Sequence, residues 1–508
     1  MTGTPTQPSS EKSPAIEQLI QQRREKKDRL LKEGKRPYGH RFERSMTLAE
    51  VHKNFEPKVP AHDQGGSEPL NETLNLAGRL MTRRDLGKLC FAHLHDHSAK
   101  LQLKLSKQDT GDDVYKSFLK DVDLGDIVGV SGKPCRTKTG ELSLQVQSFE
   151  ILSKSLRPWP EKYHGVTDIE TRTRQRELDL ATNEESRNRF LARSKIIHSI
   201  RIILDKLSFI EVETPLMQGV PGGAAAKPFI THHEALDMEL YMRVAPELYL
   251  KRLLVGGFDR VYEIGRAFRN EGIDTRHNPE FTILEAYQAY ADVRDMMELS
   301  ERLIQGAAQA LGVHEVNYRG ETCQIDAAFD RASLVDLFKK HLSLDLIELC
   351  QSKKWKQAAE DKGLRVPADA TERKCFDLLF DERILTHLDR PSFVLDYPSA
   401  FSPLAKTKPD QPLLADRFEL FIAKEEVANA YTEQNDADEQ KAKFSEELAK
   451  RQSGDEEAMP VDEEFIQALQ YGMPPAGGLG IGVDRLTMIL TGSSSIREVI
   501  LFPLLKPQ

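Results

Sequence analysis

The chain has 508 residues, which predicts two to four domains and leaves ample length for buried cores. Hydrophobic residues make up 39% and charged residues 30%, which excludes a collagen-like or largely disordered chain. The 71 Lys and Arg against 80 Asp and Glu give a formal net charge of −9, which excludes a uniformly basic coat for nucleic acid but leaves room for a local basic module.

The N-terminal segment changes character at Pro14. Residues 1–14 are rich in Pro, Ser and Thr, contain no apolar signal region, and are predicted to form a disordered tail. Apolar residues at helical spacing then predict a helix that ends at Gly34, within an N-terminal helical segment 15–65. Residues 1–50 carry 11 Lys and Arg against 7 Asp and Glu, so this helix has either a solvated charged face or a face for a polyanion.

A loop is predicted at 61–68, and short runs of strand composition follow it. The runs are LNLAGRL, LCFAHLHDH, KLQLKLS, GDIVGVSGKPC and GELSLQVQSFEIL, with a helical interval near 112–120. This pattern predicts a small β-barrel such as the OB-fold over residues 66–153. Barrels of this kind commonly bind single-stranded nucleic acid, and the side chains suited to it here are Arg79, Arg83, Arg84, Phe91, Arg136 and Lys138.

A second region begins after residues 154–180, where two prolines flank Trp159 and a charged stretch predicts an inter-domain linker. Helices and strands over 181–508 predict a second domain, which starts with a helix at 186–207 and the strand FIEVETP. Residues 341–385 are rich in helix formers and charge but carry no motif, so we interpret them as a helical insertion.

Three segments of the second region have patterns suited to ligand binding. In FIEVETPLMQGVPGGAAAKPF, Gly222 and Gly223 allow the backbone to approach a ligand closely. RVYEIGRAFRNEGIDTRHNPEFTILEAY indicates two strands around a polar loop, with Arg269 at the end of the first strand. In GGLGIGVDRLTMIL, glycines alternate along a strand, which alone favours a structural role, and Arg485 begins an amphipathic helix.

Together these segments resemble motifs 1, 2 and 3 of the class II aminoacyl-tRNA synthetases. The closest resemblance is to the class II lysyl-tRNA synthetases, through FITHHEALDMELYMRVAPELYLKRLLVGGFD before the hairpin, DRFELFIAKEEVANAYTEQND, and the glycine strand. It covers nearly the whole chain and implies an α+β, multidomain protein. An N-terminal OB-fold anticodon-binding barrel would precede a class II catalytic domain, whose antiparallel β-sheet is flanked by helices.

The resemblance also implies an activity and its partners. The enzyme would activate L-lysine with ATP to lysyl-adenylate and pyrophosphate, then transfer lysine to the 3′-terminal ribose of tRNA(Lys). It would be a cytoplasmic homodimer that uses Mg²⁺, with motif 1 around 209–215 at the two-fold interface. No run of 18 apolar residues occurs, so no membrane span is expected.

The family pattern assigns each part of the two small substrates to residues of this chain. The ε-ammonium of lysine would meet Glu285, Glu433 and Tyr287, the α-ammonium would meet Glu247 and the Gly223 backbone, and the carboxylate would meet Arg269 and Asn429. Tyr431 completes the lysine site. The ATP site would comprise Arg269, Glu271, His277, Asn278, Phe281, Glu426 and Arg485.

Metal, catalytic and anticodon roles follow from the same pattern. Glu419 and Glu426 would bind Mg²⁺, which prefers hard oxygen ligands. Arg269 and Arg485 would be the catalytic residues, because a rigid, always charged guanidinium grips phosphate at two points. No side-chain nucleophile is needed. The anticodon would meet Arg79, Phe91, His95 and Glu141.

Some features weigh against other kinds of metal site. The five cysteines form no CxxC pair, so a disulfide framework or a cysteine-based zinc site is not expected and a reducing compartment fits best. His93, His95 and His97 alternate on one barrel strand, but a strand face without Cys or carboxylate partners favours surface histidines over a metal site. We therefore expect no zinc.

Two departures from the family and three alternatives remain. Glu177 stands where an aromatic residue is usual, and Gln434 stands where Leu is common. An aspartate or asparagine synthetase would need a cationic pocket, which the acidic trio Glu247, Glu285 and Glu433 opposes. A paralogue that lysylates proteins would lack the barrel. A catalytically inactive RNA-binding protein would not be expected to keep the motif arginines and paired glutamates.

Overall fold

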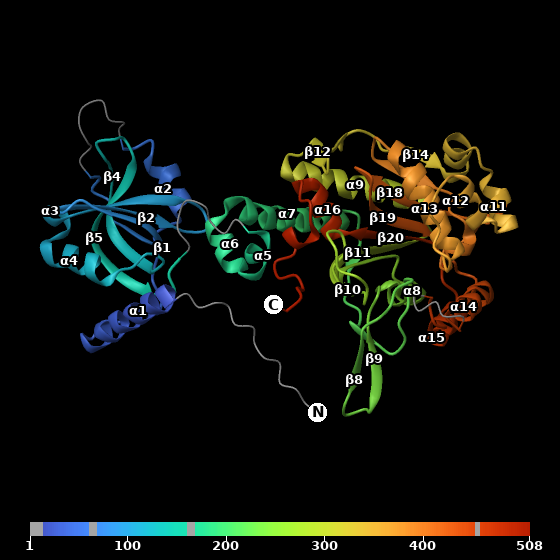
Figure 1. The fold of residues 1–508 in the computed structure, drawn as a ribbon, viewed down its shortest axis with the longest axis horizontal. Coiled ribbons are helices and arrows are strands. Elements are labelled where there is room, and N and C mark those ends of the chain that lie inside the picture. Colours follow the sequence, from blue (N-terminus) through green and yellow to red (C-terminus); the bar gives the residue numbers. More distant parts are fainter. Residues whose placement is uncertain (1–13, 60–68, 160–167, 453–457, 508) are drawn as a thin grey trace. The chain divides into compact units, whose positions relative to one another are not determined.

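The computed structural model describes residues 14–59, 69–159, 168–452 and 458–507, and it divides the chain into two compact units (Figure 1). The first unit comprises residues 1–165 with 507–508, and the second comprises residues 166–506. The predicted loop at 61–68 and the predicted tail, Pro14 excepted, lie outside the described residues.

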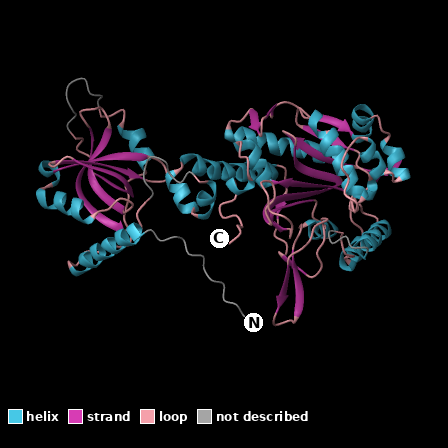
Figure 2. Cartoon of the chain, viewed as in Figure 1, coloured by secondary structure: helices cyan, strands magenta, loops and turns pink. Residues whose placement is uncertain are grey.

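The first unit is a closed barrel with the strand order β1-β2-β3-β5-β4, which confirms the predicted OB-type barrel. Along β2, Cys90, Ala92 and Leu94 are buried while the residues between them are partly exposed, as the two-residue period of a strand requires. Figure 2 shows these strands with short helices around them. The elements are α1 (Pro14–Lys32), α2 (Leu48–Phe55), β1 (Leu74–Asp85), β2 (Leu89–His95), β3 (Lys100–Ser106), α3 (Lys107–Thr110), α4 (Asp112–Asp121), β4 (Ile127–Arg136) and β5 (Leu142–Ser153).

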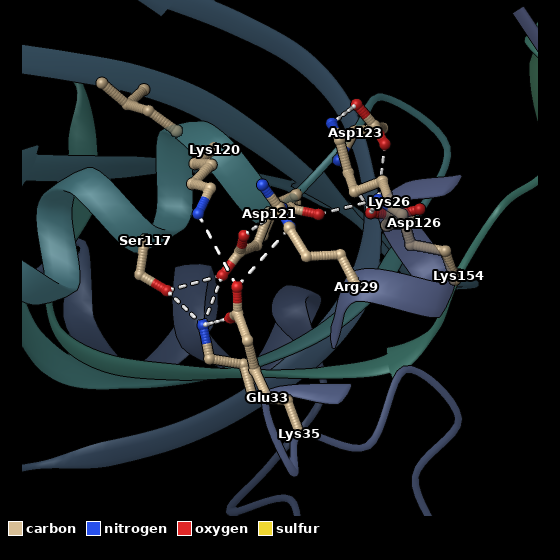
Figure 3. A network of polar contacts seen from close by, with 12 residues as sticks. Lys26, Arg29, Glu33, Lys35, Ser117, Lys120, Asp121, Asp123, Asp126 and Lys154 are labelled. Carbon is tan, nitrogen blue, oxygen red and sulfur yellow. Dashed lines mark hydrogen bonds and ion pairs between the residues drawn. The ribbon is translucent and has the colours of Figure 1, made fainter. Parts of the chain in front are cut away.

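Helix α1 contacts the barrel through its basic side chains (Figure 3). Lys26 Nζ lies 2.5 Å from Asp123 Oδ1, and Arg29 Nη2 lies 2.6 Å from Asp121 Oδ1. Lys35, just beyond the helix, lies 2.7 Å from Asp121 Oδ2. These cations therefore neutralise acidic groups of the first unit, while Arg24 and Lys32 are exposed, so the solvated face and the polyanion-binding face of this helix both stay predictions.

A buried lysine closes the same network. The side chain of Lys154 is inaccessible to solvent, and its Nζ lies 2.5 Å from Asp123 Oδ2 and 2.6 Å from Asp126 Oδ2. Because an uncompensated buried charge is costly, the lysine and the two aspartates stabilise the unit only as a group.

The second unit is built on a sheet of eight strands in the order β14-β15-β18-β19-β20-β11-β10-β6. The neighbours from β15 to β10 are antiparallel, and only the two outermost pairs are parallel, which confirms the predicted antiparallel sheet. The strands are β6 (Ile210–Glu211), β10 (Arg260–Phe268), β11 (Glu280–Ala289), β14 (Asp330–Ser333), β15 (Ser392–Leu395), β18 (Arg417–Ile422), β19 (Glu425–Thr432) and β20 (Ala476–Gly482). The smaller sheets hold β7 (Met217–Gln218), β8 (Ile230–His233), β9 (Met238–Met242), β12 (Glu315–Tyr318), β13 (Glu321–Gln324), β16 (Thr407–Lys408) and β17 (Gln411–Ala415).

The main sheet has one apolar face and one polar face. Leu284, Ala286, Leu479 and Ile481 pack with apolar residues of α7, α9 and α16 in the largest core. Their neighbours along the strands point to the opposite face, where the pocket described below is found. The helices are α5 (Ile169–Arg174), α6 (Arg176–Thr182), α7 (Glu184–Lys206), α8 (Glu247–Val255), α9 (Val293–Leu311), α10 (Leu334–Leu337), α11 (Leu346–Ser352), α12 (Trp355–Asp361), α13 (Glu372–Arg383), α14 (Ala437–Gln452), α15 (Glu463–Gln470) and α16 (Val483–Thr491).

The predicted linker 154–180 is in part folded structure, because it contains α5 and most of α6, which belong to the second unit. The charged residues that suggested a linker pair with one another: Asp179 is buried and accepts hydrogen bonds from Arg172 and Arg176, each at 2.8 Å. Glu177 is exposed, so its departure from the family pattern leaves the core unaffected.

The structure offers no candidate for a membrane span among the residues it describes, because none of their helices is both long enough and apolar enough.

We predict that Lys154→Met lowers the stability of the barrel by about 3–5 kcal/mol, because the buried Asp126 would lose the cation that it pairs with and Asp123 would keep Lys26 alone. The chain has two tryptophans, Trp159 and Trp355, one in each unit, so urea unfolding followed by Trp159 fluorescence in a Trp355→Phe background reports on the first unit.

The matched control is Lys116→Met, which removes the exposed ion pair with Asp112 and should cost at most about 1 kcal/mol. Equal midpoints for the Lys154→Met protein and the parent would contradict the role given to the buried network.

Candidate active site

A cavity of about 400 Å³ opens on the polar face of the main sheet. Its wall brings together residues that lie far apart in the chain and come from all three segments with patterns suited to ligand binding. Of the residues predicted to bind lysine, ATP or Mg²⁺, those that line the cavity are Gly223, Glu247, Arg269, Glu271, His277, Asn278, Phe281, Glu285, Tyr287, Glu419, Glu426, Asn429, Tyr431 and Arg485. Glu433 is the exception and lies behind the wall.

Strand pairing at the centre of the sheet explains this convergence. β11 pairs with β10 on one side and with β20 on the other, so that Glu285 lies between Glu263 and Gly480. β19 pairs with β20 and places Asn429 beside Gly480. Since every second residue of a strand points to the same face, polar side chains of three adjacent strands meet over the glycines of β20.

Arg269 follows β10 directly, and its guanidinium lies 5.1 Å from the centre of the Phe281 ring. Its Nε is buried and has no hydrogen-bond partner among the described residues. Burial lowers the pKa of Arg269, yet a guanidinium stays protonated in proteins. A fixed cation with an unused donor is suited to an anionic ligand group.

Arg485 occupies the first turn of α16, at the end of the glycine strand. It donates to the backbone carbonyl of Glu426 and lies 3.3 Å from the Glu426 carboxylate. Its neighbour Asp484 is buried, pairs with Arg193 of α7 at 2.5 Å, and accepts from the Thr282 backbone at 2.6 Å. The position of Arg485 is therefore tied to α7 and β11.

The acidic end of the cavity carries Glu247 and Glu285, both buried, and each meets a tyrosine hydroxyl. Tyr431 donates to the Glu247 carboxylate at 2.7 Å, and Tyr287 donates to Glu285 Oε2 at 3.1 Å. Burial, with the nearby charge of Glu247, raises the pKa of Glu285 to about 8. An ammonium group placed here would favour the ionised form of both carboxylates.

Glu433 lies just behind this end, wholly buried, and forms an ion pair with Lys251. Gly478 separates its carboxylate from the cavity: a Cβ at this glycine would lie 1.9 Å from Glu433 Oε1 and 2.5 Å from the Tyr287 ring. Gly478 is thus the opening through which a ligand in the cavity reaches Glu433. Gln434 is buried too, and its Oε1 accepts from the Asp436 backbone at 2.9 Å.

Gly223 closes the cavity near Glu247. It adopts a φ of +89°, and a Cβ there would lie 3.0 Å from the Cβ of Glu247. A side chain at this position would be strained and would crowd the acidic end.

Glu419 and Glu426 line the same cavity from adjacent strands, β18 and β19. Glu419 is buried, pairs with Arg417 at 2.5 Å and accepts from Tyr397 at 2.9 Å; burial raises its pKa. No group of three or more His, Cys, Asp or Glu in the described part of the chain is placed to hold a metal ion. Two carboxylates suit Mg²⁺ that takes its other ligands from phosphate and water.

The loop between β10 and β11 is held by its own polar contacts. Asp274 accepts from the backbone of His277 at 2.7 Å and lies 2.9 Å from its Nδ1, which positions the exposed imidazole. Asn278 is buried, donates to the Glu280 carbonyl at 2.6 Å, and leaves its Oδ1 without a partner among the described residues. Glu271 is exposed at the cavity rim.

The residues predicted to bind the anticodon share the outer surface of the barrel. Phe91 and His95 lie on the partly exposed face of β2, and Arg79 pairs with His95 across strands. Glu141 lies 3.2 Å from His93, which also contacts Thr82, so His93 serves in a polar network of the barrel surface.

Several basic residues first suggested for this surface are bound to the barrel itself. Arg83 donates to the carbonyls of Leu119 and Val122, and Arg136 donates to the carbonyls of Val59 and Gly140. Such side chains brace the barrel, because their donors are used by the backbone. Arg79 also donates to the Gly125 carbonyl and stacks 4.5 Å from the Trp159 ring centre.

Four cations at or near the cavity were not predicted from the sequence, and one of them, Arg276, lies in the loop between β10 and β11 and pairs with Glu425 at 3.0 Å. Arg417 could have been found from its position two residues before Glu419, and Lys251 from its position one helical turn after Glu247. Arg373 lines the cavity from α13, within the predicted insertion 341–385, and no sequence signal marks it. The insertion therefore contributes to the site.

Comparison with known proteins gives a consistent result for both units. Residues 168–506 match the family model described as tRNA synthetases class II (D, K and N), and residues 74–152 match the OB-fold nucleic acid binding domain. The chain is 49% identical to a lysine–tRNA ligase of Pelotomaculum thermopropionicum, covering 97% of this chain and 96% of the relative. It is 48% identical to one of Carboxydothermus hydrogenoformans (97% and 99%) and 46% identical to one of Enterococcus faecalis (95% and 96%).

We predict that Gly478→Ala lowers the stability of the second unit by about 1–3 kcal/mol, because the new methyl group would overlap Glu433 and Tyr287. Gly480→Ala on the same strand is the matched control, since its Cβ would have no neighbour nearer than 3.8 Å. Urea unfolding followed by Trp355 fluorescence in a Trp159→Phe background measures both. Equal stability of the two variants would contradict the crowding inferred at Gly478.

Proposed function

Because this chain belongs to the lysine–tRNA ligases of the class II aminoacyl-tRNA synthetases, we propose that its cavity binds lysine at the acidic end and ATP at the arginine end. The chain is a ligase. The lysine carboxylate attacks the α-phosphorus of ATP, pyrophosphate leaves, and lysyl-adenylate forms. The 3′-terminal ribose hydroxyl of tRNA(Lys) then attacks the lysyl carbonyl, loses its proton, and AMP leaves.

The observation that carries the lysine assignment is the convergence of Glu247, Glu285 and Glu433 on one end of the cavity. We assign the α-ammonium to Glu247 and the Gly223 backbone, and the ε-ammonium to Glu285 and Glu433. A synthetase for aspartate or asparagine would need cations at this end instead, so the acidic trio also supports lysine over those substrates.

The other substrate groups have donors in matching places. Tyr287 and Tyr431 orient the two carboxylates that line the cavity, which supports their roles in the lysine site. Asn429 accepts a hydrogen bond from Arg417, which holds its side chain in place. We propose that its amide, together with the unused donor of Arg269, holds the lysine carboxylate.

At the ATP end, we propose that Arg269 contacts the α-phosphate and Arg485 the γ-phosphate. His277, Asn278, Phe281 and Glu271 surround the remaining phosphates and the adenine. Catalysis then consists of orienting the two reactants and stabilising the charge that develops on phosphate. Phe281 stacks near Arg269 and restricts its guanidinium, which supports a preorganised contact.

We further propose that Glu419 and Glu426 hold Mg²⁺ when ATP is bound. The ion would neutralise phosphate charge and align the oxygens of ATP. Arg417 and Tyr397 orient Glu419, while Arg485 and the cavity wall orient Glu426.

The barrel is proposed to read the tRNA anticodon through Arg79, Phe91, His95 and Glu141. Phe91 offers a ring for base stacking, Glu141 offers an acceptor, and both lie on the outer side of the barrel. Charging of tRNA for protein synthesis takes place in the cytoplasm, where we place this enzyme.

We also propose a homodimer, with the motif 1 strand at its interface. Apolar side chains near this strand are exposed in the single chain, among them Ile210, Leu216, Met217 and Ile230, each with 45–61% of its surface accessible. A second copy that covers them would remove this apolar area from water.

Arg269→Ala should lower lysine-dependent ATP–pyrophosphate exchange by about 10²–10³-fold, because it removes a donor from a charge that grows in the transition state. Arg266→Ala is the matched control: this arginine lies three residues earlier, on β10, is half-exposed, and pairs with Glu280 at 3.5 Å. Activity within tenfold of the parent in Arg269→Ala would refute its assigned role.

Phe91→Ala should weaken tRNA(Lys) binding by about 1–3 kcal/mol through loss of base stacking, while pyrophosphate exchange stays unchanged. Filter binding and aminoacylation kinetics measure the first effect, and the exchange assay is the internal control. Leu124→Ala, at another exposed apolar residue of the barrel unit, provides a comparison. Loss of exchange and charging together would indicate a structural role for Phe91.

Sedimentation at micromolar concentration should give a species of about twice the chain mass of 57.5 kDa, and Met217→Asp should shift it toward the single-chain mass. A parent protein that sediments as a single chain would exclude the dimer.

A further inference from the structure

One lysine of the protein itself lies within the acidic end of the cavity wall. Lys251 is on α8, one turn after Glu247, and its side chain is inaccessible to solvent. Its Nζ lies 2.6 Å from Glu247 Oε1 and forms an ion pair with the carboxylate of Glu433. The rings of Tyr431 and Phe465 lie 5.5 and 5.9 Å from this ammonium and cover it.

Two other cations near these carboxylates are already paired, and Arg269, which also lies near Glu285, is assigned to the carboxylate of the substrate. Arg243 lies near Glu285 but pairs with Glu263 at 2.5 Å. Lys443 of α14 donates to the Ala405 carbonyl at 2.7 Å and faces Glu439. The titratable and charged groups that face Lys251 or its two partners are Glu247, Glu285, Tyr287, Tyr431, Glu433 and Lys443.

The charges at this end can be counted. The carboxylates of Glu247, Glu285 and Glu433 contribute −3, and Lys251 contributes +1, so the ionised site carries −2. L-Lysine brings two ammonium groups, and its carboxylate is assigned to Arg269. The bound site is then neutral, which matters because uncompensated charge is costly in a buried site.

We propose that Lys251 is a positioning residue that sets the charge of the lysine site to match a substrate with two ammonium groups, and that it holds Glu247 and Glu433 in place from behind. This inference rests on the proposed function. The ammonium of Lys251 takes one oxygen of each carboxylate, Tyr431 contacts both oxygens of Glu247, and Oε1 of Glu433 is left beside Gly478 for the ligand. Lys251 itself does not line the cavity, so it acts through its two partners.

The titration behaviour of the group is consistent with this role. Burial alone would lower the pKa of Lys251, but Glu247 and Glu433 raise that pKa above its usual value, so the side chain of Lys251 stays charged. Burial raises the pKa of Glu433, and Lys251 opposes that rise. Without Lys251, the pKa of Glu433 would rise further, so L-lysine would displace more of the proton held by Glu433 on binding than it does in the parent.

The test is the effect of Lys251→Met in two backgrounds. In the parent, the variant leaves three carboxylates facing two ammonium groups, so the KM for lysine should rise about 30-fold or more at pH 7.5. In a Glu433→Gln background, the same change converts a site of −1 into a site of −2, so the KM for lysine should stay within threefold or fall. If Lys251 had a purely structural role, Lys251→Met would raise the KM for L-lysine in both backgrounds.

Calorimetry gives a second readout that packing alone would not change. Titration of L-lysine into the full-length protein at pH 7.5, in two buffers of different ionisation enthalpy, counts the protons released on binding. Lys251→Met should release more protons than the parent, and the ratio of variant to parent KM should shrink between pH 7 and pH 9. In the Glu433→Gln background, Lys251→Met should not increase the proton release.

The controls separate the possible failures. Arg252→Met removes a cation from the next position of α8, where it reaches Glu464 at the surface, and should leave the KM for lysine unchanged. The KM for ATP should be the same in all variants. A parent without lysine-dependent exchange would overturn the proposed function. An active parent with equal losses from Lys251→Met in both backgrounds would overturn only the role of Lys251. If the single variant does not fold, the comparison within the Glu433→Gln background still decides.

Discussion

Three carboxylates buried at one end of the cavity impose the main constraint on this molecule, because an ionised acid is costly to remove from water. Each neighbour of the trio reduces that cost. The hydroxyl groups of Tyr431 and Tyr287 donate hydrogen bonds to Glu247 and Glu285. Lys251 supplies a positive charge. Gly478 leaves space beside Glu433. In the proposed function, a ligand with two ammonium groups would supply the compensation that the protein leaves out, so that stability and substrate choice would depend on the same charges.

The period of the β-strand makes such a site compatible with a stable fold. On β11, Leu284 and Ala286 enter the apolar core, while Glu285 faces the cavity. On β20, Leu479 and Ile481 also enter the apolar core, and Gly480 lies between them. Apolar and polar requirements are thus met by alternate residues of the same strands, and the core under α7 and α9 keeps the polar face rigid.

The first unit also pairs its buried carboxylates with cations. Asp121, Asp123 and Asp126 are neutralised by lysines and an arginine from both ends of the unit, including the wholly buried Lys154. In the second unit, the pairing of Asp179 with Arg172 and Arg176 converts a charged segment into two packed helices. Charge that looks solvated in a sequence is internal structure in both places.

The strand pattern of the sequence predicted the barrel, because strand alternation is a local property of the chain. The antiparallel sheet and the set of residues around the cavity followed from the resemblance of the sequence to the class II synthetases. The sequence did not reveal Arg373 in the insertion, the internal use of Arg83 and Arg136, or the folded part of the predicted linker. These features depend on which group, far away in the chain, each side chain contacts in the folded protein. Only the tertiary structure showed that Lys251 and Glu433 share a buried position, since 182 residues separate them in the chain and no local pattern encodes a pairing of that range.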